Sequence, residues 1–376
     1  MNIDYDIQGL VSVRLINPSP SLARVAARQL NPLQPATPGN DPDISISHLA
    51  FGSDTARGNR LGDAGDGQQC RFDESEFSLV IGDAEISLPF DSVGQSCEIR
   101  CTRNTNMRRL FIDYVRPALH MSLLPKGALA LHSAAVSYKG KGILLAGWAE
   151  SGKTEAMLGF LQAGATFVSD KWTIVDGKGP SIRHFPTPIT VRNWMIELIP
   201  GLSNRLKATE RLRARAAGVA GSLLATTGAA GRVPGLREVK GLADLGGRVS
   251  VTPSQLFGNR HEERSRWGMS SSAPLECLFL LMTTAEEKIT VRPAETAEVA
   301  RRLADCAAYE RRAFLGLYQR FRYALPGRRN PLLEESSDRE AETLAKALAS
   351  KQVYKVDVPF PFNPAALHEA IGHFCE

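Results

Sequence analysis

One eight-residue segment near the middle of the chain limits what the protein can fold into more than any other. Residues 147–154 read Gly-Trp-Ala-Glu-Ser-Gly-Lys-Thr and fit the pattern G-x-x-x-x-G-K-[ST]. In this pattern the glycines let backbone N–H groups turn inward around phosphate oxygens, the lysine neutralises the β- and γ-phosphates, and the last hydroxyl can ligate Mg²⁺. The segment therefore predicts a loop that binds the phosphates of a nucleotide. The predicted nucleotide-binding residues are Gly147, Trp148, Ala149, Glu150, Ser151, Gly152, Lys153 and Thr154.

The residues on either side of this segment supply the strand and the helix that such a loop needs. The apolar run Gly142–Ala146 predicts a buried strand, and Glu155–Ala163 predicts a short helix with Gly164 at its C-cap. The dipole of that helix favours a phosphate at its N-terminus. We therefore expect the order strand, phosphate-binding loop, helix. The apolar side of the helix is formed by Met157, Phe160 and Leu161.

The next predicted strand, Ala165–Ser169, ends at Asp170. The two strands of a strand–helix–strand unit run parallel, so both end at the same edge of the sheet. We therefore expect Asp170 to lie beside the phosphate-binding loop. Its carboxylate can hold Mg²⁺ there or accept a proton from an attacking hydroxyl. The alternative is an aspartate that only begins a turn.

His132, the G-x-x-x-x-G-K-T-E segment and the strand that ends in Ser169-Asp170 together resemble the HPr kinase/phosphorylase family. These are P-loop kinases related to phosphoenolpyruvate carboxykinase. The resemblance implies an α/β fold with a P-loop core of the HPr kinase/PEP carboxykinase type. It also implies ATP, Mg²⁺ and phosphorylation of a hydroxyl, commonly that of a serine. The chain looks closer to the HPr-kinase-related proteins found beside peptide-modification genes, including lasso-peptide kinases.

The same resemblance implies roles for individual residues. Lys153 and Thr154 take the phosphate and metal roles, and Glu155 lies near the metal. Asp170 is the catalytic base, and His132 approaches the transferred phosphate. The implied metal site therefore consists of Thr154, Glu155 and Asp170. The family's later glycine- and arginine-rich signature is not recognisable here, which favours forward kinase activity over phosphorolysis.

The N-terminal third is predicted to be rich in strands. Asp6–Ile16 predicts a first strand, and the prolines between it and Ile44 predict a loop or linker. Gly52–Gly67 predicts an exposed loop, and Gly82-Asp83 predicts the turn of a hairpin. We expect a β-rich N-terminal lobe over residues 1–125 and a P-loop kinase domain over residues 126–376. Extra strands on the kinase sheet are the alternative.

The segments around and after the core predict further regular elements. Met107–Leu124 predicts a helix kinked at Pro117, with its aromatic residues in the core. Trp172–Val175 and Ser181–Phe185 predict a hairpin, and Leu275–Leu281 predicts a buried strand. Ala294–Phe321 predicts one or two helices.

Arginines beyond Asp170 supply two further hypotheses. Arg192 is a candidate for stabilising the phosphoryl transition state, and a solvated surface charge is the alternative. Residues 202–232 are rich in Ala, Gly and Arg. They predict a lid or acceptor-binding segment that closes over phosphate, or a solvated helix face.

Composition and charge limit the partners. The net charge of +5 suits an acidic ligand such as ATP but is too small to indicate nucleic acid. No apolar run approaches the roughly 20 residues needed to cross a bilayer, so no membrane partner is expected. Scattered cysteines and the absence of an N-terminal signal sequence predict a cytoplasmic protein. The sequence leaves open whether the protein forms a homo-oligomer.

The leading hypothesis is an ATP- and Mg²⁺-dependent kinase that acts on a hydroxyl. The acceptor is left open among a serine of a protein or peptide, and a small alcohol. A second hypothesis is a catalytically impaired nucleotide-binding regulatory or scaffold protein. This hypothesis is motivated by Lys171, which can pair with Asp170 and lower the pKa of its carboxyl group. The unusual loop residues Trp148 and Glu150 also motivate it.

Overall fold

The protein is a mixed α/β protein that divides into two compact units. The computed structural model describes residues 1–37, 39, 41–49, 58–62, 68–199, 202–206, 248–257 and 268–375. The first unit comprises Met1–Pro186 and Met269–Glu376, and the second comprises Thr187–Gly268. The boundary expected after residue 125 falls inside the first unit, so independent folding of residues 1–125 stays a prediction.

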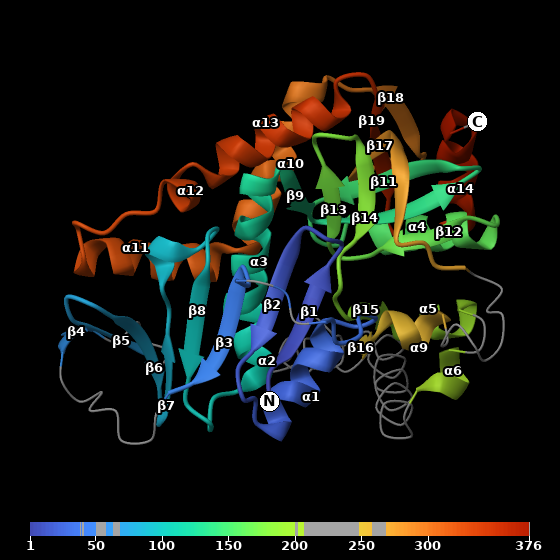
Figure 1. The fold of residues 1–376 in the computed structure, drawn as a ribbon. Helices are drawn as coiled ribbons and strands as arrows, with labels where there is room; N and C mark the ends of the chain where they lie inside the picture. The colour runs from blue at the N-terminus through green and yellow to red at the C-terminus, as the bar shows by residue number, and fades with distance from the viewer. Residues whose placement is uncertain are drawn as a thin grey trace, which may run out of the picture. The chain divides into compact units, whose positions relative to one another are not determined.

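An eight-stranded sheet occupies the N-terminal part of the first unit, in the order β1-β2-β3-β8-β7-β6-β5-β4 (Figure 1). Pairing is antiparallel except for β2–β3 and β3–β8, which are parallel. The predicted strand content of this region is therefore present. The strands are β1 (Ile3–Ile7), β2 (Val11–Leu15), β3 (Ile44–His48), β4 (Asn59–Leu61), β5 (Gln68–Phe72), β6 (Phe77–Ile81), β7 (Ala84–Ser87) and β8 (Cys97–Cys101).

Three local predictions for this region need correction. The single strand expected over Asp6–Ile16 is a hairpin of β1 and β2, because Gln8 and Gly9 both adopt positive φ and reverse the chain. The loop expected before Ile44 contains the helix α1 (Pro20–Gln29), which Pro20 can begin because the first helical N–H needs no partner. Within the expected 52–67 loop, the described residues 58–62 include β4, and the remainder lies outside the described residues.

The predicted helix over Met107–Leu124 is confirmed, with an irregular middle. It begins as α2 (Met107–Arg109), continues as the π-helical segment η2 (Leu110–Val115), and ends as α3 (Arg116–Leu123) and the 3₁₀ turn η3 (Leu124–Lys126). The wider π turn precedes Pro117, which lacks the N–H that an α-helix would require. Its aromatic side chains Phe111 and Tyr114 are buried, as expected.

A nine-stranded mixed sheet forms the centre of the first unit. Its main order is β12-β10-β11-β17-β14-β13-β9, and β19 pairs with both β17 and β18. The pairs β11–β17 and β17–β19 are parallel, and the remaining pairs are antiparallel. The strands are β9 (Ala128–Leu131), β10 (Ser133–Tyr138), β11 (Lys141–Gly147), β12 (Thr166–Ser169), β13 (Thr173–Asp176), β14 (Ser181–His184), β17 (Ser272–Thr284), β18 (Thr290–Pro293) and β19 (Gln352–Pro359).

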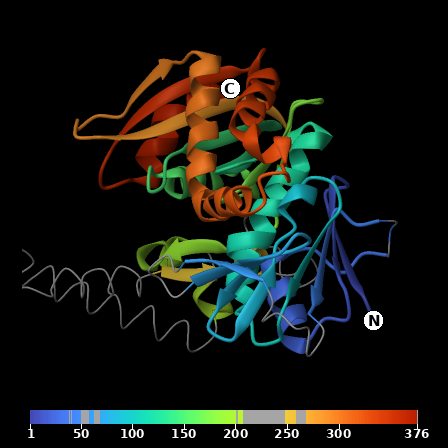
Figure 2. The same ribbon diagram turned by 90° about the vertical axis from the view of Figure 1, so that its left-hand side faces the viewer.

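Two groups of helices cover this sheet (Figure 2). The helices α10 and α13 pack together and contact β9, and α4 and α14 pack together beside β10 and β18. The predicted hairpin of β13 and β14, the buried strand β17 and the pair of helices over 294–321 are confirmed. The helices are α4 (Lys153–Gln162), α10 (Thr296–Glu310), α11 (Arg312–Ala324), α12 (Pro331–Glu334), α13 (Ser336–Leu348) and α14 (Pro364–Ile371), and the 3₁₀ turns are η1 (Phe90–Ser92) and η4 (Gly372–Cys375).

The second unit contains one two-stranded sheet among its described residues. The strands β15 (Ile189–Arg192) and β16 (Arg248–Val251) are antiparallel. In the described part of this unit, three short helices accompany them: α5 (Asn193–Leu198), α6 (Leu202–Arg205) and α9 (Pro253–Phe257). Most of the basic segment expected to act as a lid, residues 207–232, lies outside the described residues. In the part of the chain that the structure describes, no helix has the length and apolar character needed to span a bilayer.

Candidate functional site

The loop at residues 147–154, hereafter the glycine loop, connects a buried strand to a helix as predicted. The strand β11 ends at Gly147 and the helix α4 begins at Lys153. Gly147 has a φ of 146° and Gly152 a φ of 90°, which side chains rarely allow. A Cβ at Gly147 would also lie only 2.4 Å from the carbonyl oxygen of Leu281. Both glycines are therefore required by the backbone.

The helix α4 holds the end of the glycine loop in place. Gly164 adopts a φ of 93°, and the N–H groups of Gly164 and Ala165 donate to the carbonyls of Leu161 and Phe160. This is a Schellman motif, so the predicted C-cap is confirmed. Met157, Phe160 and Leu161, expected on the apolar side, are buried, and so are most of the other residues of α4. Its outer side is covered by α14, at Gly159.

Asp170 lies next to the glycine loop, as expected from chain topology. Both β11 and β12 run antiparallel to β10, which separates them, so they are parallel to each other and end at the same edge. The Thr154 Oγ1 donates to the Asp170 carboxylate, at 3.2 Å from Oδ2 and 3.3 Å from Oδ1. Two residues 16 positions apart thus place a hydroxyl and a carboxylate together.

Burial sets the ionisation of Asp170. The side chain is 4% exposed, and loss of hydration raises its pKa to about 6. The backbone N–H of Lys171, the charge of Lys153 and the Thr154 hydroxyl oppose this rise without cancelling it. The expected lowering of the pKa by Lys171 is therefore outweighed by burial. Lys171 itself adopts a φ of 70° at the end of β12, and burial lowers its pKa to about 8.

Lys153 points back into the glycine loop. Its Nζ donates to the carbonyl oxygen of Gly147, at 2.9 Å, and to that of Trp148. The side chain is 8% exposed, and burial lowers its pKa, while Cys306, Asp170 and Glu310 act in the opposite direction. The ammonium is therefore held by neutral carbonyl dipoles at the position where a loop of this type would meet an anion. Glu155 is buried in the first turn of α4.

His132 is buried beside the loop, together with two residues that the sequence did not indicate. Its Nδ1 lies 3.7 Å from the Cys306 Sγ and 4.0 Å from the Glu310 Oε1. The Cys306 Sγ also lies 3.8 Å from the carbonyl oxygen of Gly147. Burial, followed by Lys153 and Lys171, lowers the His132 pKa to about 3, so the imidazole is neutral. Cys306 and Glu310 are four residues apart on α10. This spacing places both on one face of the helix and was the only hint in the sequence that they could act together.

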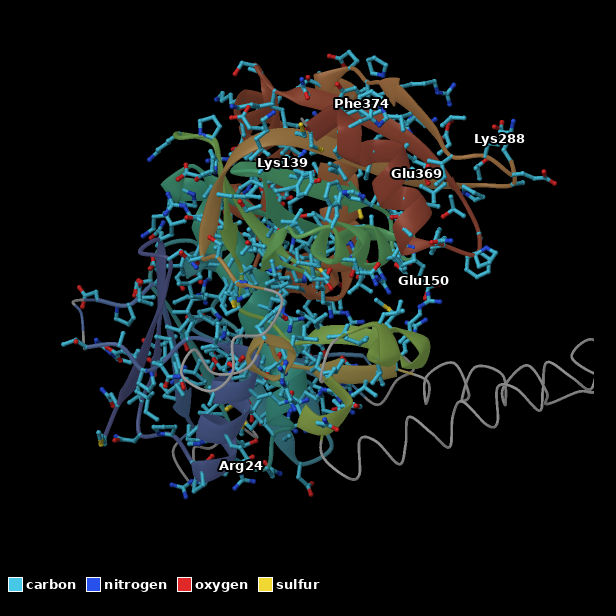
Figure 3. All side chains as sticks on the ribbon, turned by 90° about the vertical axis from the view of Figure 1, so that its right-hand side faces the viewer. Arg24, Lys139, Glu150, Lys288, Glu369 and Phe374 are labelled. Carbon is cyan, nitrogen blue, oxygen red and sulfur yellow. The ribbon has the colours of Figure 1, made fainter. Side chains whose placement is uncertain are left out.

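Trp148 is half exposed at the surface and its ring makes a tilted contact with another aromatic ring. Its ring centroid lies 4.8 Å from that of Tyr309 at the end of α10, and the Arg312 guanidinium lies 4.2 Å from the Tyr309 centroid. Trp148 and Tyr309 are 51% and 45% exposed. Glu150, labelled in Figure 3, is also exposed and adopts a φ of 61°. The two residues that make the loop unusual therefore face solvent and not the loop interior.

Arg192 is the candidate predicted to stabilise the transition state, and Arg183 and His184 are two further basic residues between it and Asp170. Arg192 ends β15 in the second unit, opposite Arg248 in the register, so its role at the site stays a prediction. Arg183 forms an ion pair with Asp176 at 2.7 Å. His184 is buried, with its Nδ1 2.8 Å from the carbonyl oxygen of Val168. Arg183 and His184 therefore have structural partners within the sheet.

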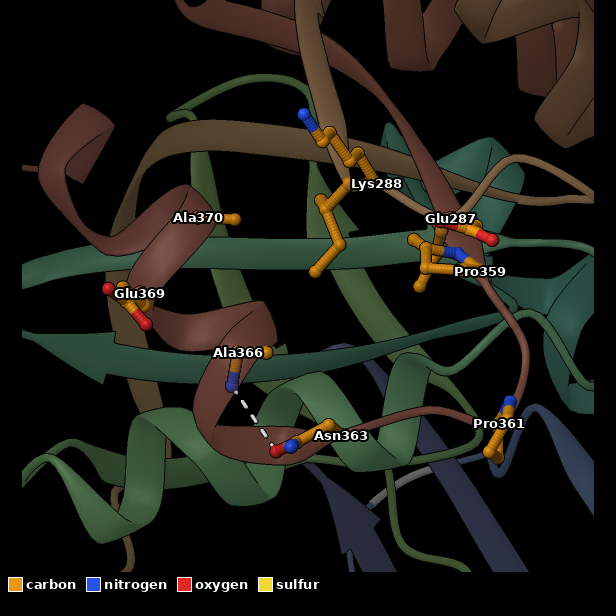
Figure 4. Close-up of a pocket in the computed structure, with 10 residues that line it drawn as sticks. Glu287, Lys288, Pro359, Pro361, Asn363, Ala366, Glu369 and Ala370 are labelled. Carbon is orange, nitrogen blue, oxygen red and sulfur yellow. Dashed lines mark hydrogen bonds between the residues drawn. The ribbon is translucent and has the colours of Figure 1, made fainter.

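A pocket of about 450 Å³ lies between α14, the end of β19 and the turn before β18 (Figure 4). Its charged lining residues are Glu287, Lys288 and Glu369, and Asn363 at its base caps α14 by accepting from the Ala366 N–H at 3.3 Å. Among the described residues, no three His, Cys, Asp or Glu side chains lie close enough together to hold a metal ion.

No protein-family model matches the chain, and no curated protein matches it.

Proposed function

We propose that the protein is a kinase with a P-loop core of the HPr kinase/PEP carboxykinase type, which uses ATP and Mg²⁺ to phosphorylate a hydroxyl. The observation that carries the proposal is the contact between Thr154 and Asp170, at the end of a glycine loop that contains a buried lysine. A hydroxyl, a carboxylate and an ammonium at one sheet edge are the groups that phosphoryl transfer requires.

The residues of the glycine loop are suited to bind a nucleoside triphosphate. The Ser151 hydroxyl is buried and has no hydrogen-bond partner among the described residues, which suits a donor to phosphate. The space beside Gly147 would be filled by any side chain. Thr154 and Asp170 offer the oxygen ligands that Mg²⁺ prefers, and Mg²⁺ takes only one or two such groups when phosphates supply the others. When bound, Mg²⁺ would offset the negative charge of the phosphates.

Lys153, Asp170 and His132 would each have a different role in phosphoryl transfer. Lys153 would exchange the Gly147 and Trp148 carbonyls for phosphate oxygens, which are stronger acceptors. Asp170, whose pKa is raised to about 6, is still mostly ionised at neutral pH and is a stronger base than an exposed aspartate. It would accept the proton of the acceptor hydroxyl. Neutral His132 would lie close to the phosphates without repelling them.

The test compares wild type with Lys153→Ala and Asp170→Asn. We expect both changes to reduce phosphoryl transfer by about a thousandfold or more, because this chemistry depends on positioning and charge. Asp170→Asn should retain nucleotide binding within about threefold, since the amide preserves the shape and the Thr154 contact. The measurement is incorporation from γ-labelled ATP with Mg²⁺ and cell extract, beside calorimetric titration with ATP. Wild-type turnover by Asp170→Asn would remove Asp170 as the base.

A second candidate is a nucleotide-binding regulatory protein without catalysis. Its support is the Lys153 Nζ, which is already bonded to two carbonyls of its own loop, and the half-buried Lys171 beside Asp170. This candidate predicts that ATP binds and that no acceptor in the extract is labelled by wild type. Labelling that requires Lys153 would exclude it.

A further inference from the structure

A groove of about 910 Å³ runs along one side of α11, outside the glycine loop. Its floor and walls come from α11, from the α2–η2 helix and from the β4–β5 hairpin. Along α11 the lining residues include Arg312, Gly316, Arg320 and Tyr323, which are spaced so that they share one face of the helix. We call this feature the α11 groove.

The α11 groove is strongly basic. Its lining includes three arginines, Arg109, Arg312 and Arg320, and one carboxylate, Asp113. Asp113 pairs with Arg109 at 3.6 Å, so it offsets only one of the three positive charges. Arg312 contacts the Tyr309 ring and carbonyl, and these neutral partners leave its charge uncompensated. A ligand of this groove should therefore carry negative charge.

The length of the groove favours an extended chain over a compact ligand. From Arg312 to Tyr323 the helix advances eleven residues, which corresponds to about 16 Å at 1.5 Å per residue. An extended peptide covers that distance with about five residues. The exposed aromatic ring of Tyr323 at one end adds an apolar contact of the kind that peptide-binding surfaces use.

The other end of the groove leads to the glycine loop. Arg312 lines the groove and also lies over the Tyr309 ring, which contacts the Trp148 ring of the loop in a tilted arrangement. Glu310, which follows Tyr309 and is the last residue of α10, lies 4.0 Å from His132 and acts electrostatically on Lys153 and Lys171. The junction between α10 and α11 therefore borders both the groove and the residues around Asp170.

We propose that the α11 groove binds the phosphate acceptor, and that this acceptor is an extended peptide segment with acidic residues near the modified hydroxyl. Arg312 and Arg320 bind its carboxylates, and the Trp148–Tyr309 pair supports the part that leads to Asp170. This inference rests on the proposed kinase function for the identity of the bound chain as an acceptor. The binding of an acidic peptide can be tested without turnover.

The experiment uses two fluorescein-labelled peptides with a single serine, one with glutamates around it and one with glutamines in their place. Binding to the full-length protein is followed by fluorescence anisotropy. We expect the acidic peptide to bind at least about tenfold more tightly than the neutral peptide, with an affinity that falls as salt is added. The double variant Arg312→Glu/Arg320→Glu should lose about tenfold or more for the acidic peptide, because two attractive charges become repulsive.

The matched control is Arg24→Glu on α1, an exposed arginine that does not line the groove (Figure 3). It should bind the acidic peptide as wild type does. If the double variant shows a lowered melting temperature, the milder Arg312→Gln/Arg320→Gln replaces it, with about a threefold loss expected. Equal affinity for both peptides, or equal losses in the groove and control variants, would overturn the proposal, as would displacement of the peptide by ATP.

Separate measurements distinguish this proposal from the kinase function. ATP titration of wild type and Lys153→Ala tests the glycine loop alone. ATP binding without preference for the acidic peptide would overturn the groove proposal and leave the kinase proposal standing. Preference for the acidic peptide without ATP binding would overturn the kinase proposal and leave the binding of acidic peptides to the α11 groove standing.

Discussion

Single ionisable residues in this protein have their charge set mainly by burial. Asp170, His132 and Lys171 all have pKa values displaced toward the neutral form, with loss of hydration as the largest cause. His184, the last residue of β14, belongs to the same class, and its Nδ1 lies 2.8 Å from the carbonyl oxygen of Val168 in β12. The proposed chemistry assigns it no role.

His184 should make the folded protein less stable in mild acid. Burial lowers its pKa from 6.5 to about 4, although a hydrogen bond to the Val168 carbonyl opposes this. Between these values the unfolded chain binds the proton and the folded chain does not, so stability falls as the pH drops from about 6.5 to about 4. One such group costs about 2 kcal/mol between roughly pH 7.5 and pH 5.

Urea unfolding of wild type and His184→Asn at these two pH values measures the effect. Asparagine can still donate to the Val168 carbonyl but cannot take up a proton, so the variant should lose about 2 kcal/mol less stability than wild type on acidification. An identical pH dependence in the two proteins would show that His184 titrates normally.

At the scale of elements, the packing of α4 against α14 positions the glycine loop. Gly159 of α4 allows this close approach, because a Cβ there would lie 2.1 Å from the Pro364 carbonyl oxygen. At the N-terminus of the same helix, a Cβ on Gly152 would lie 3.1 Å from the ring of Phe362, in the segment before α14. The helix α14 and the segment before it thus contact both ends of the region 152–159, which carries Lys153 and Thr154.

Gly159→Ala should destabilise the protein, although alanine normally favours helices. The backbone carbonyl of Pro364 cannot move without shifting α14, and overpacking of this kind costs about 1–3 kcal/mol. The control is Gly316→Ala in α11, where the new methyl group meets nothing within 4 Å. That change should stabilise by up to about 1 kcal/mol. Urea unfolding of both variants gives the two signs, and stabilisation by Gly159→Ala would contradict the observed helix contact.

At the scale of the whole first unit, the N-terminal sheet depends on helices from the C-terminal part of the chain. Phe77 packs against Phe321 of α11, and Phe90 packs against Phe314 and Phe321, with ring centroids 5.1–5.7 Å apart. The buried Asn330 side chain donates to the carbonyls of Phe90 and Val93, at 2.7 and 2.9 Å. The two regions therefore share one core.

A fragment of residues 1–125 should not fold cooperatively. Without α11 it exposes the rings of Phe77 and Phe90 and leaves two carbonyls without their donor, and the lost aromatic burial alone costs several kcal/mol, about 2 per side chain. We expect strong binding of a hydrophobic dye and a broad urea transition, with the full chain as control. A sharp transition for the fragment would support an independent N-terminal lobe.

Much of the glycine loop and its surroundings could be predicted because the relevant physics is local. Two glycines with positive φ, an apolar strand before them and a capped helix after them are encoded within residues 142–164. The position of Asp170 also followed, since a short helix between parallel strands leaves few topologies. The hairpin of β1 and β2 and the helix α1 were not predicted. Gln8 adopts a positive φ that its residue type does not indicate, and Pro20 was interpreted as a residue that breaks regular structure although it begins a helix.

The sequence by itself thus determined the glycine loop, the helix that follows it and the neighbouring carboxylate. Only the tertiary structure brought Cys306, Glu310, Tyr309 and Arg312 to them, because β17 pairs with β11 across more than a hundred intervening residues and the following α10 then packs against the same sheet. The raised pKa of Asp170 was decided in the same way. A residue loses its hydration only when the folded first unit surrounds it. The sequence neighbour Lys171 therefore does not determine the pKa of Asp170.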